Sequence, residues 1–234
     1  MKASLTIIRY PAWAIPFAWI SMGLFRLPLW LNKQILFYKL MGCGRNGTFD
    51  VQPDLRQWAI LTIQSEFSAT TDHRRQHGSL IYYWIRLFNG EAYTLLLTPV
   101  AGHGKWDGRE PFGNLPRQSD EPGRMAVLTR ATIRLSKLAY FWKNVAPVAQ
   151  QMLRAPGFEY SVGIGEIPWV KQATFSVWKD ATAMKSFAYG DDRHKEVIRQ
   201  TRRQDWYSED LFVRFRIDQT IGTLRGIDPL GENA

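Results

Sequence analysis

Apolar and polar residues along the second half of the chain predict a regular succession of strands and helices. In several short segments the two kinds of residue alternate, as in strands with one buried face. These segments are MAVLTRATIR (125–134), FEYSVGIGEI (158–167), KQATFSVWK (171–179) and DLFVRFRI (210–217). Helical spacing predicts helices over 135–153 and over 180–204, the second broken at Gly190. The order is β-α-β-β-α-β, which is the ferredoxin-like unit.

The first half of the chain repeats this order with weaker sequence similarity. Strands are predicted over 4–9, 34–44, 56–64 and 92–100, and helices over 11–32 and 68–89. Short strings also correspond: RQWAILTI resembles KQATFSVW, which aligns Gln57 with Gln172, and MGCG resembles VGIG. The shared order of elements indicates an internal duplication.

Two such units in one chain predict an α+β fold. Each unit covers one face of its sheet with helices and leaves the other face open, so two units can close on each other. We therefore expect tandem ferredoxin-like repeats that form an intramolecular, pseudo-dimeric α/β barrel. The repeats span 1–100 and 125–218, joined by a Gly- and Pro-rich linker over 101–124 and followed by a tail over 219–234.

Alternation also separates the two faces of the second sheet. One side of the last strand carries Leu211, Val213, Phe215 and Ile217. The other side carries Phe212, Arg214 and Arg216, and the matching side of two further strands carries Arg130, Thr132, Arg134, Thr174, Ser176 and Trp178. We assign the apolar side to the helices. The mixed side then faces either water or a pocket for a large apolar ligand with carboxylates, and alternation leaves both readings open.

The segment PAWAIPFAWISMGLF (11–25) is the most apolar part of the chain. Its uncharged run of about 15 residues is shorter than the roughly 20 that span a bilayer, and Arg26 ends it. No cleavage site of a signal peptide follows. An apolar helical stripe nevertheless continues through Trp13, Phe17, Ile20, Leu24, Leu27 and Leu31. A core helix and a peripheral membrane contact both remain open.

Composition narrows the class of protein and of partner. The 234 residues are 45% hydrophobic, which suffices for a packed interior, and the single cysteine excludes an internal disulfide and favours the cytoplasm. The net charge of +9 predicts an acidic partner or an anionic surface. Lys and Arg are spread along the chain without a nucleic-acid-binding motif, so we do not expect nucleic acid as a partner.

Common catalytic motifs are either absent from the sequence or lack the structural context that they need. GCGRNG (42–47) matches the dinucleotide fingerprint in spacing, but no helix is predicted after it, so we interpret it as a turn. No G-x-S-x-G motif occurs, and Cys43 has no histidine neighbour in sequence. Flavin, nicotinamide and nucleophilic hydrolase chemistry are therefore not indicated.

Three of the four histidines give weak signals. His73 and His77 have the spacing of a zinc helix, but Arg74 stands where a metalloprotease has glutamate, so we expect a solvated helix face. His103 lies beside Trp106 in the linker, where we expect a loop residue, although it could face a substrate.

His194 gives a stronger signal. It lies on the same predicted helix face as Val197, Ile198 and Thr201, so the imidazole points inward as either a core residue or a ligand. Its place in the first turn of the predicted helix keeps the ring neutral, because the positive end of the helix disfavours imidazolium. A neutral imidazole can bind iron.

The sequence resembles the spheroidene monooxygenase family of carotenoid biosynthesis. The resemblance rests on RATIRLSKLAYFW, YSVGIGEIPWVKQATFSVWKDATAMKSFAYG, RHKEVIRQTRRQDWYSEDLFVRF, KLMGCGRNGTF, RQWAIL and GKWDGREPF. It covers the chain from about Leu5 to Ile217 and is strongest after Met125. It implies a haem-containing enzyme, a monooxygenase that oxidises an acyclic carotenoid to a ketone with dioxygen.

The resemblance also suggests how the cofactor is held. Haem proteins on similar barrels, such as chlorite dismutases and haem-degrading oxygenases, bind the iron through a histidine on the second helix of the unit. By this analogy His194 is the proximal iron ligand, Arg214 and Arg130 pair with the haem propionates, and Trp178 lines the pocket. No distal catalytic residue is predicted.

The partners follow from this chemistry. We expect a hydrophobic carotenoid drawn from a membrane, dioxygen as co-substrate, and an acidic electron donor such as a ferredoxin. We expect a cytoplasmic protein, with peripheral contact at the inner membrane as a second option. Two alternatives stay open on the same barrel: a cofactor-free oxygenase, and a non-catalytic protein that binds haem or a carotenoid.

Overall fold

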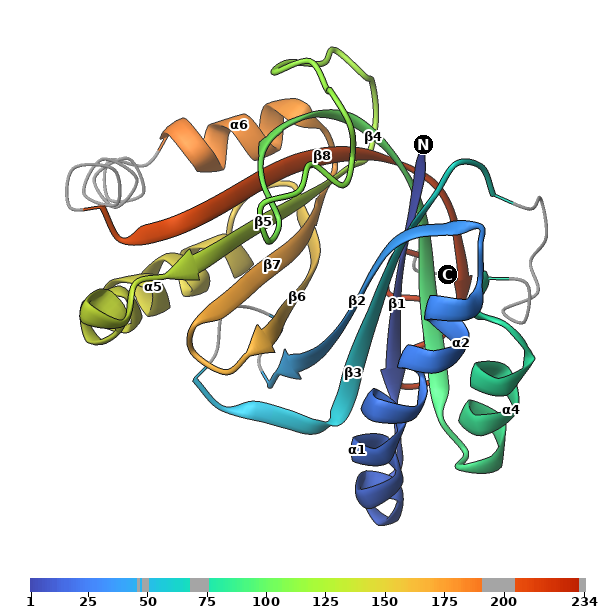
Figure 1. The fold of residues 1–234 in the computed structure, drawn as a ribbon. Helices are drawn as coiled ribbons and strands as arrows, with labels where there is room; N and C mark the ends of the chain where they lie inside the picture. Colours follow the sequence, from blue (N-terminus) through green and yellow to red (C-terminus); the bar gives the residue numbers. More distant parts are fainter. Residues whose placement is uncertain (46, 48–50, 68–75, 191–204, 232–234) are drawn as a thin grey trace.

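Backbone hydrogen bonds between neighbouring strands close the sheet into a barrel in the computed structural model (Figure 1). The structure describes residues 1–45, 47, 51–67, 76–190 and 205–231. The strands are β1 (Lys2–Arg9), β2 (Ile35–Gly44), β3 (Pro53–Gln64), β4 (Glu91–Gly104), β5 (Met125–Ile133), β6 (Phe158–Ile167), β7 (Lys171–Trp178) and β8 (Tyr207–Gly222). The helices are η1 (Ala12–Ala14), α1 (Ile15–Leu24), α2 (Arg26–Leu31), α4 (Ser79–Leu87), η2 (Leu135–Lys137), α5 (Leu138–Leu153) and α6 (Ala181–Gly190).

The strand order confirms the predicted fold class. Around the barrel the order is β1-β3-β2-β6-β7-β5-β8-β4, so each half contributes the same arrangement of four strands, β4-β1-β3-β2 and β8-β5-β7-β6. One junction between the halves is long, because β4 pairs with β8 from Tyr93 opposite Gly222 to Gly104 opposite Leu211. The other junction joins β2 to β6 through Gly42 with Gly165 and Cys43 with Ile164.

The predicted elements coincide closely with the observed ones. The helix predicted over 180–204 begins as α6, and its remainder lies outside the described residues, as do residues 68–75 of the helix predicted over 68–89. Strands β1 and β3 begin two or three residues early, and the largest extensions are those of β4 into the linker as far as Gly104 and of β8 to Gly222. At the end of β4, Gly104 has a φ of 97° and lies against the Asp210 carbonyl, so a side chain does not fit there.

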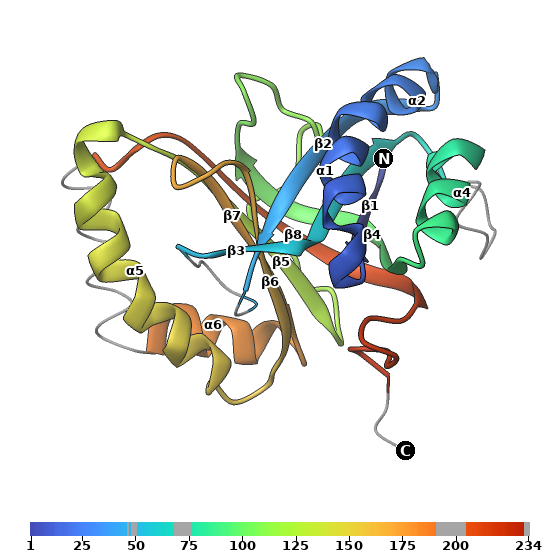
Figure 2. The same cartoon turned by 90° about the horizontal axis from the view of Figure 1, so that it is seen from below.

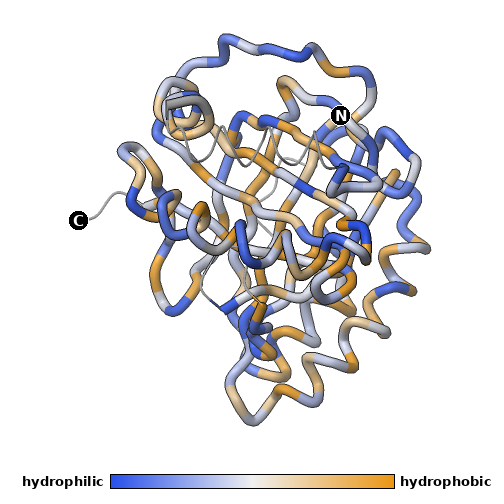
Figure 3. Tube along the Cα trace, turned by 90° about the vertical axis from the view of Figure 1, so that its left-hand side faces the viewer, coloured by the Kyte–Doolittle hydropathy of each residue, from blue (hydrophilic) through white to orange (hydrophobic). Residues whose placement is uncertain are grey.

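The barrel interior is filled by apolar side chains, which corrects the predicted assignment of faces. Leu211, Val213 and Phe215 point into this core rather than toward the helices. The mixed side of β7 and β8 faces outward, where Phe212 and Trp178 pack beneath the helices of the second half, whereas Arg130 and Thr132, predicted on that same side, share the inward side of β5 with Ala126 and Leu128. The prediction was wrong because closure of the barrel removes the inner face from water on every side, so that face needs the uniformly apolar residues. In Figure 3 hydrophobic and hydrophilic positions alternate over short distances along the trace, as two unlike faces require.

The helices form two separate outer layers. Helices α1, α2 and α4 lie over the first half, and α5 and α6 lie over the second half, with the strands between the two groups (Figure 2). Residues Ala12–Leu31 (η1, α1 and α2), which we term the α1–α2 segment, pack on the sheet through Ala14, Ala18, Phe25 and Leu29, all nearly inaccessible to water. The predicted apolar stripe is not this inner face, because Trp13, Ile20, Leu27 and Leu31 are exposed.

Candidate functional site

Polar side chains lie between the sheet and the helices of the second half, a region we term the C-terminal layer. It comprises Gln151, Thr174, Ser176, Trp178 and Arg214. Period-two geometry places Thr174, Ser176 and Trp178 on one side of β7. Val127 of β5 pairs with Ser176 on one flank and with Arg214 of β8 on the other, so these residues form a row across three strands.

The helices cover this row directly. Val127 belongs to the apolar cluster that includes Met152 of α5 and Met184 of α6. Asp180 fixes the start of α6, because its Oδ1 accepts a hydrogen bond of 2.7 Å from the backbone N–H of Ala183. Thr174, Ser176 and Arg214 are each less than a tenth exposed as a result.

Several polar atoms in the C-terminal layer have no partner among the described residues. These are Nε and Nη1 of Arg214, Oγ1 of Thr174 and Oε1 of Gln151. The carbon of the Arg214 guanidinium lies 5.5 Å from the centre of the Phe212 ring, which is a weaker partner than a carboxylate. Buried groups of this kind are normally paired, so the chemistry of the unpaired guanidinium suits an acidic group.

The equivalent layer of the first half shows the contrast. There the buried hydroxyls bond to one another: Ser4 Oγ lies 2.7 Å from Thr62 Oγ1, and Thr6 Oγ1 lies 2.8 Å from Thr94 Oγ1. Unpaired buried atoms also occur in this layer, at Tyr10 Oη and Trp84 Nε1, so the second half differs in that one of its unpaired groups is the charged guanidinium of Arg214.

Trp178 is buried in this layer as part of the packing. Its ring stacks on Phe187 of α6 at 5.1 Å between centroids, and Phe158 meets it edge-on at 5.6 Å. The indole N–H donates a hydrogen bond of 3.0 Å to Ser176 Oγ. Trp178 thus forms an apolar wall beside Ser176.

His194, the predicted iron ligand, lies outside the described residues. The described chain before it ends with Gly190 of α6, and the chain after it resumes at Asp205. The ligand assignment of His194 therefore stays a prediction.

His77 is buried, which corrects the prediction of a solvated face. Its Nε2 lies 2.7 Å from Thr6 Oγ1 on the helix-facing side of β1, and the residue is 2% exposed. Sequence reasoning missed this position, although a signal was present. Ile81 and Ile85 follow at intervals of four, and both are buried on the same side of the helix. His73 lies outside the described residues.

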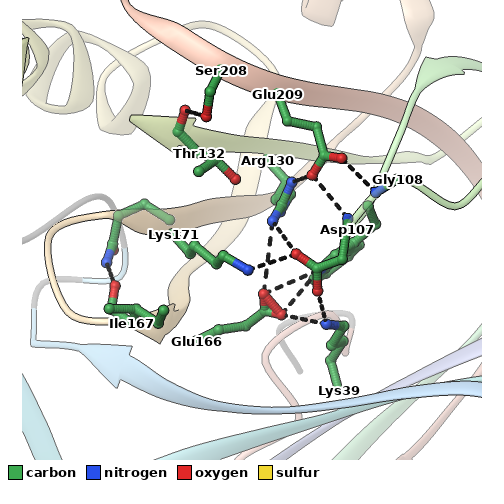
Figure 4. A network of polar contacts seen from close by, with 12 residues as sticks. Lys39, Asp107, Gly108, Arg130, Thr132, Glu166, Ile167, Lys171, Ser208 and Glu209 are labelled. Atoms are coloured by element: carbon green, nitrogen blue, oxygen red, sulfur yellow. Dashed lines mark hydrogen bonds and ion pairs between the residues drawn. The ribbon is translucent and has the colours of Figure 1, made fainter. Parts of the chain in front are cut away.

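Arg130 lies on the opposite face of the sheet from Arg214, at one end of the barrel interior. Figure 4 shows it in a charged network with residues of both halves and of the linker. Arg130 pairs with Glu209, and its Nη2 lies 3.3 Å from Asp107 Oδ1. The sheet therefore separates the two arginines.

The whole network, which we term the end network, is centred on Asp107 and Glu166. Asp107 pairs with Lys39 of the first half and with Lys171 of the second, the latter at 2.6 Å. Burial acts to raise the pKa of Asp107, but the hydrogen bonds from both lysines outweigh it and lower the pKa to about 2. Glu166 accepts a hydrogen bond of 3.0 Å from the indole N–H of Trp106. The linker turn is thereby fixed at the end of the barrel.

Two further positions singled out from the sequence lie elsewhere. His103 is exposed near the end of β4 rather than in a loop, and it lines a cavity of about 220 Å³ with Glu110 and Arg117. This cavity is small for a large ligand. Cys43 is buried in the barrel core, where desolvation raises the pKa of its thiol to about 12. A thiol of this kind is not a nucleophile at neutral pH.

Comparison with known proteins provides the family relationship. No family model matches the chain. A spheroidene monooxygenase of Cereibacter sphaeroides is 38% identical over 84% of this chain, which spans 60% of that relative's length. A spheroidene monooxygenase of Rhodobacter capsulatus is 35% identical over 97% of this chain and 95% of the relative. Among solved structures, an aldoxime dehydratase in complex with butyraldoxime has a TM-score of 0.59 at 10% identity, covering 92% of this chain and 79% of that one. This last likeness is one of fold.

Proposed function

Because the chain belongs to the spheroidene monooxygenase family, we propose that it is a haem-dependent monooxygenase that oxidises an acyclic carotenoid to a ketone with dioxygen. The observation that carries the proposal is the relationship to the Rhodobacter capsulatus protein, which extends over nearly the whole of both chains. The name of that relative supports the reaction class and the kind of substrate.

The C-terminal layer supports the haem part of the proposal. Haem carries two propionates, and a buried guanidinium whose Nε and Nη1 lack partners among the described residues suits one of them. Arg214 is therefore the residue that we propose to hold a propionate. We propose His194 as the iron ligand, since it follows α6, the helix that covers this layer. Arg130 has carboxylate partners of its own, so we leave it out of the proposed site.

The chain's own contribution is to bind, orient and exclude water. Trp178, Phe187 and Phe212 give the layer an apolar wall for haem and polyene. Thr174 Oγ1 and Gln151 Oε1 offer hydrogen-bonding groups that have no described partner. When bound, a histidine-ligated haem supplies the activation of dioxygen.

The reaction fixes which co-reactants are needed. Each hydroxylation of one carbon inserts one oxygen atom of dioxygen and, with two electrons and two protons, releases the other as water. A second hydroxylation of the same carbon gives a gem-diol, which loses water to form the ketone. We propose that the electrons come from an acidic protein such as a ferredoxin, because the chain carries a net charge of +9. We place the enzyme in the cytoplasm, at the inner membrane where its substrate dissolves.

Absorption spectroscopy tests the haem ligand directly. We expect the protein expressed with ample haem to show a Soret band, which His194→Ala abolishes or shifts. His77→Ala is the matched control. His77 is a buried histidine of the other repeat, and its Nε2 contacts Thr6 Oγ1. Loss of the band in His77→Ala alone, or no band in the parent protein, contradicts the proposal.

Turnover separates the alternatives that the sequence leaves open. The protein is incubated with an acyclic carotenoid, dioxygen and reduced ferredoxin, and the product is identified by mass spectrometry. A ketone formed only with haem present supports the proposal. A ketone formed without haem identifies a cofactor-free oxygenase, and binding without turnover identifies a carrier.

A further inference from the structure

The outward face of the α1–α2 segment is apolar along its length. It exposes Trp13, Trp19, Ile20, Leu27, Trp30 and Leu31. Their exposed fractions run from 55% for Ile20 to 71% for Trp30. A surface helix of a globular protein normally turns polar residues outward, so this face departs from the usual pattern.

The same surface continues onto α4, where Leu80, Tyr83 and Leu87 are exposed at helical spacing. Ring contacts join the two helical segments, because Phe17 of α1 stacks on Phe88, the residue that follows α4, at 4.2 Å between centroids. Helices α1, α2 and α4 also lie side by side on the outside of the first half (Figure 2). We term the exposed residues of these three helices the apolar face.

The fold does not require an apolar face at this place. The α1–α2 segment already packs on the sheet through small buried residues on its other side, among them Ala14, Ala18 and Ser21. In the second repeat α5 follows the first strand as α1 does in the first repeat. Its outward positions include Lys143 and Gln150, with Arg154 just beyond its end. Among the described helices the first repeat thus has the more extensive apolar face, since α5 exposes large apolar side chains only at Tyr140 and Leu153.

The charges around the apolar face distinguish between two partners, a second copy of the chain and an anionic bilayer. Helices α1, α2 and α4 contain no acidic residue, and the first one in the chain is Asp50. Arg26 and Lys33 are exposed at the two ends of α2 and form no ion pair within the described part of the chain. A symmetric dimer through this face brings the same surface, with its positive charges, against itself. Exposed Trp and Leu bordered by cations instead match the boundary of an anionic bilayer.

We propose that the apolar face docks on anionic lipid, with α1, α2 and α4 lying in the interface and their inner sides remaining on the sheet. Among the described residues Ala12–Leu31 is also long and apolar enough to cross a membrane by length and composition. Its packing on β3 and with α4 favours the interfacial position over a crossing. The face lies away from the C-terminal layer, so docking does not depend on the proposed function. Under that function it brings the enzyme to the phase that contains the carotenoid.

Vesicle flotation of the purified full chain tests the docking. We expect the protein to float with vesicles of equal parts phosphatidylcholine and phosphatidylglycerol, and more weakly with phosphatidylcholine alone. Trp30→Gln combined with Leu31→Gln should weaken binding to the mixed vesicles by about tenfold or more. Arg26→Gln combined with Lys33→Gln should remove most of the preference for the anionic lipid, also by about tenfold.

The control pair is Leu135→Gln with Leu153→Gln, two exposed leucines of the other repeat, and it should bind as the parent does. Circular dichroism verifies that every variant is folded. Three outcomes overturn the proposal: no flotation of the parent, flotation resistant to alkaline carbonate as for an embedded span, or a parent dimer in light scattering that the Trp30 and Leu31 pair dissociates. Haem content is measured separately and does not enter this readout.

Discussion

At the scale of single residues, two buried arginines in neighbouring strands have opposite surroundings. Arg130 is 2% exposed and pairs with Glu209, Asp107 and, at a longer distance, Glu166. Arg214 is 7% exposed, and two of its three guanidinium nitrogens have no partner among the described residues. A buried charge without a partner lowers stability, whereas a paired one is costly to break. The same substitution should therefore act in opposite directions at the two positions.

We predict that Arg214→Met raises the free energy of unfolding of the haem-free protein by about 1–3 kcal/mol, because an apolar chain replaces an unpaired buried charge. Arg130→Met should lower it by about 1–3 kcal/mol, because Glu209 loses its cation, whereas Asp107 and Glu166 keep their lysine partners. Urea unfolding of both variants measures the difference. In haem titrations Arg214→Met should bind more weakly than the parent. Equal destabilisation by both substitutions would mean that Arg214 is already paired in solution.

The residue scale is also where the sequence was least informative. Alternation correctly separated Arg214 from Leu211 and Val213, but it assigned the two faces to the wrong layers. Alternation with period two defines which residues of a strand share a face. It does not define whether that face points into the barrel or toward the helices. His77 was missed because the charged residues next to it hid the apolar spacing that it shares with Ile81 and Ile85.

At the scale of elements, the sequence predicted nearly every described strand and helix. Strand β8 was found because its face of Leu211, Val213 and Phe215 is apolar, and α5 because its apolar stripe runs from Phe141 to Met152. The ends were less predictable. Strand β8 continues to Gly222 beyond its apolar run because it pairs with β4, a partner distant in sequence. Tertiary pairing, which local pattern does not contain, sets those limits.

The start of α6 provides a prediction at this scale. Asp180 caps the helix through the N–H of Ala183, so Asp180→Ala should lower the free energy of unfolding by about 1 kcal/mol. Asp180→Asn is the matched control and should cost only a few tenths, because asparagine caps a helix about as well. Urea unfolding of the three proteins gives the comparison. Equal losses in both variants would show that the charge of Asp180, rather than the cap, stabilises this end of the helix.

At the scale of the whole molecule, the duplication makes the two halves share one interior. Apolar residues of both halves meet inside the barrel, among them Leu5, Leu95, Phe175 and Phe215. The junction of β4 with β8 is extensive, but β2 meets β6 at a single short stretch. The end network joins the halves by another route, since Lys39 belongs to β2 whereas Lys171 and Arg130 belong to the second repeat. Asp107 and Glu209 of this network have lowered pKa values in the folded state and therefore link the stability of the barrel to pH.

The sign of this dependence follows from the pKa of Asp107. Its folded-state pKa is about 2, below the value of about 3.9 for an unfolded aspartate, so its contribution is fully present above about pH 4 and disappears as pH falls toward 2. Asp107 is 36% exposed, and water screens its pairs, so we expect a contribution of about 1 kcal/mol. Asp107→Asn, which tolerates the φ of 52° at this position, removes it. Urea unfolding from pH 6 to pH 2 should show the parent more stable at pH 6 and the two curves converging near pH 2, whereas curves that stay parallel would assign the acid dependence to other carboxylates.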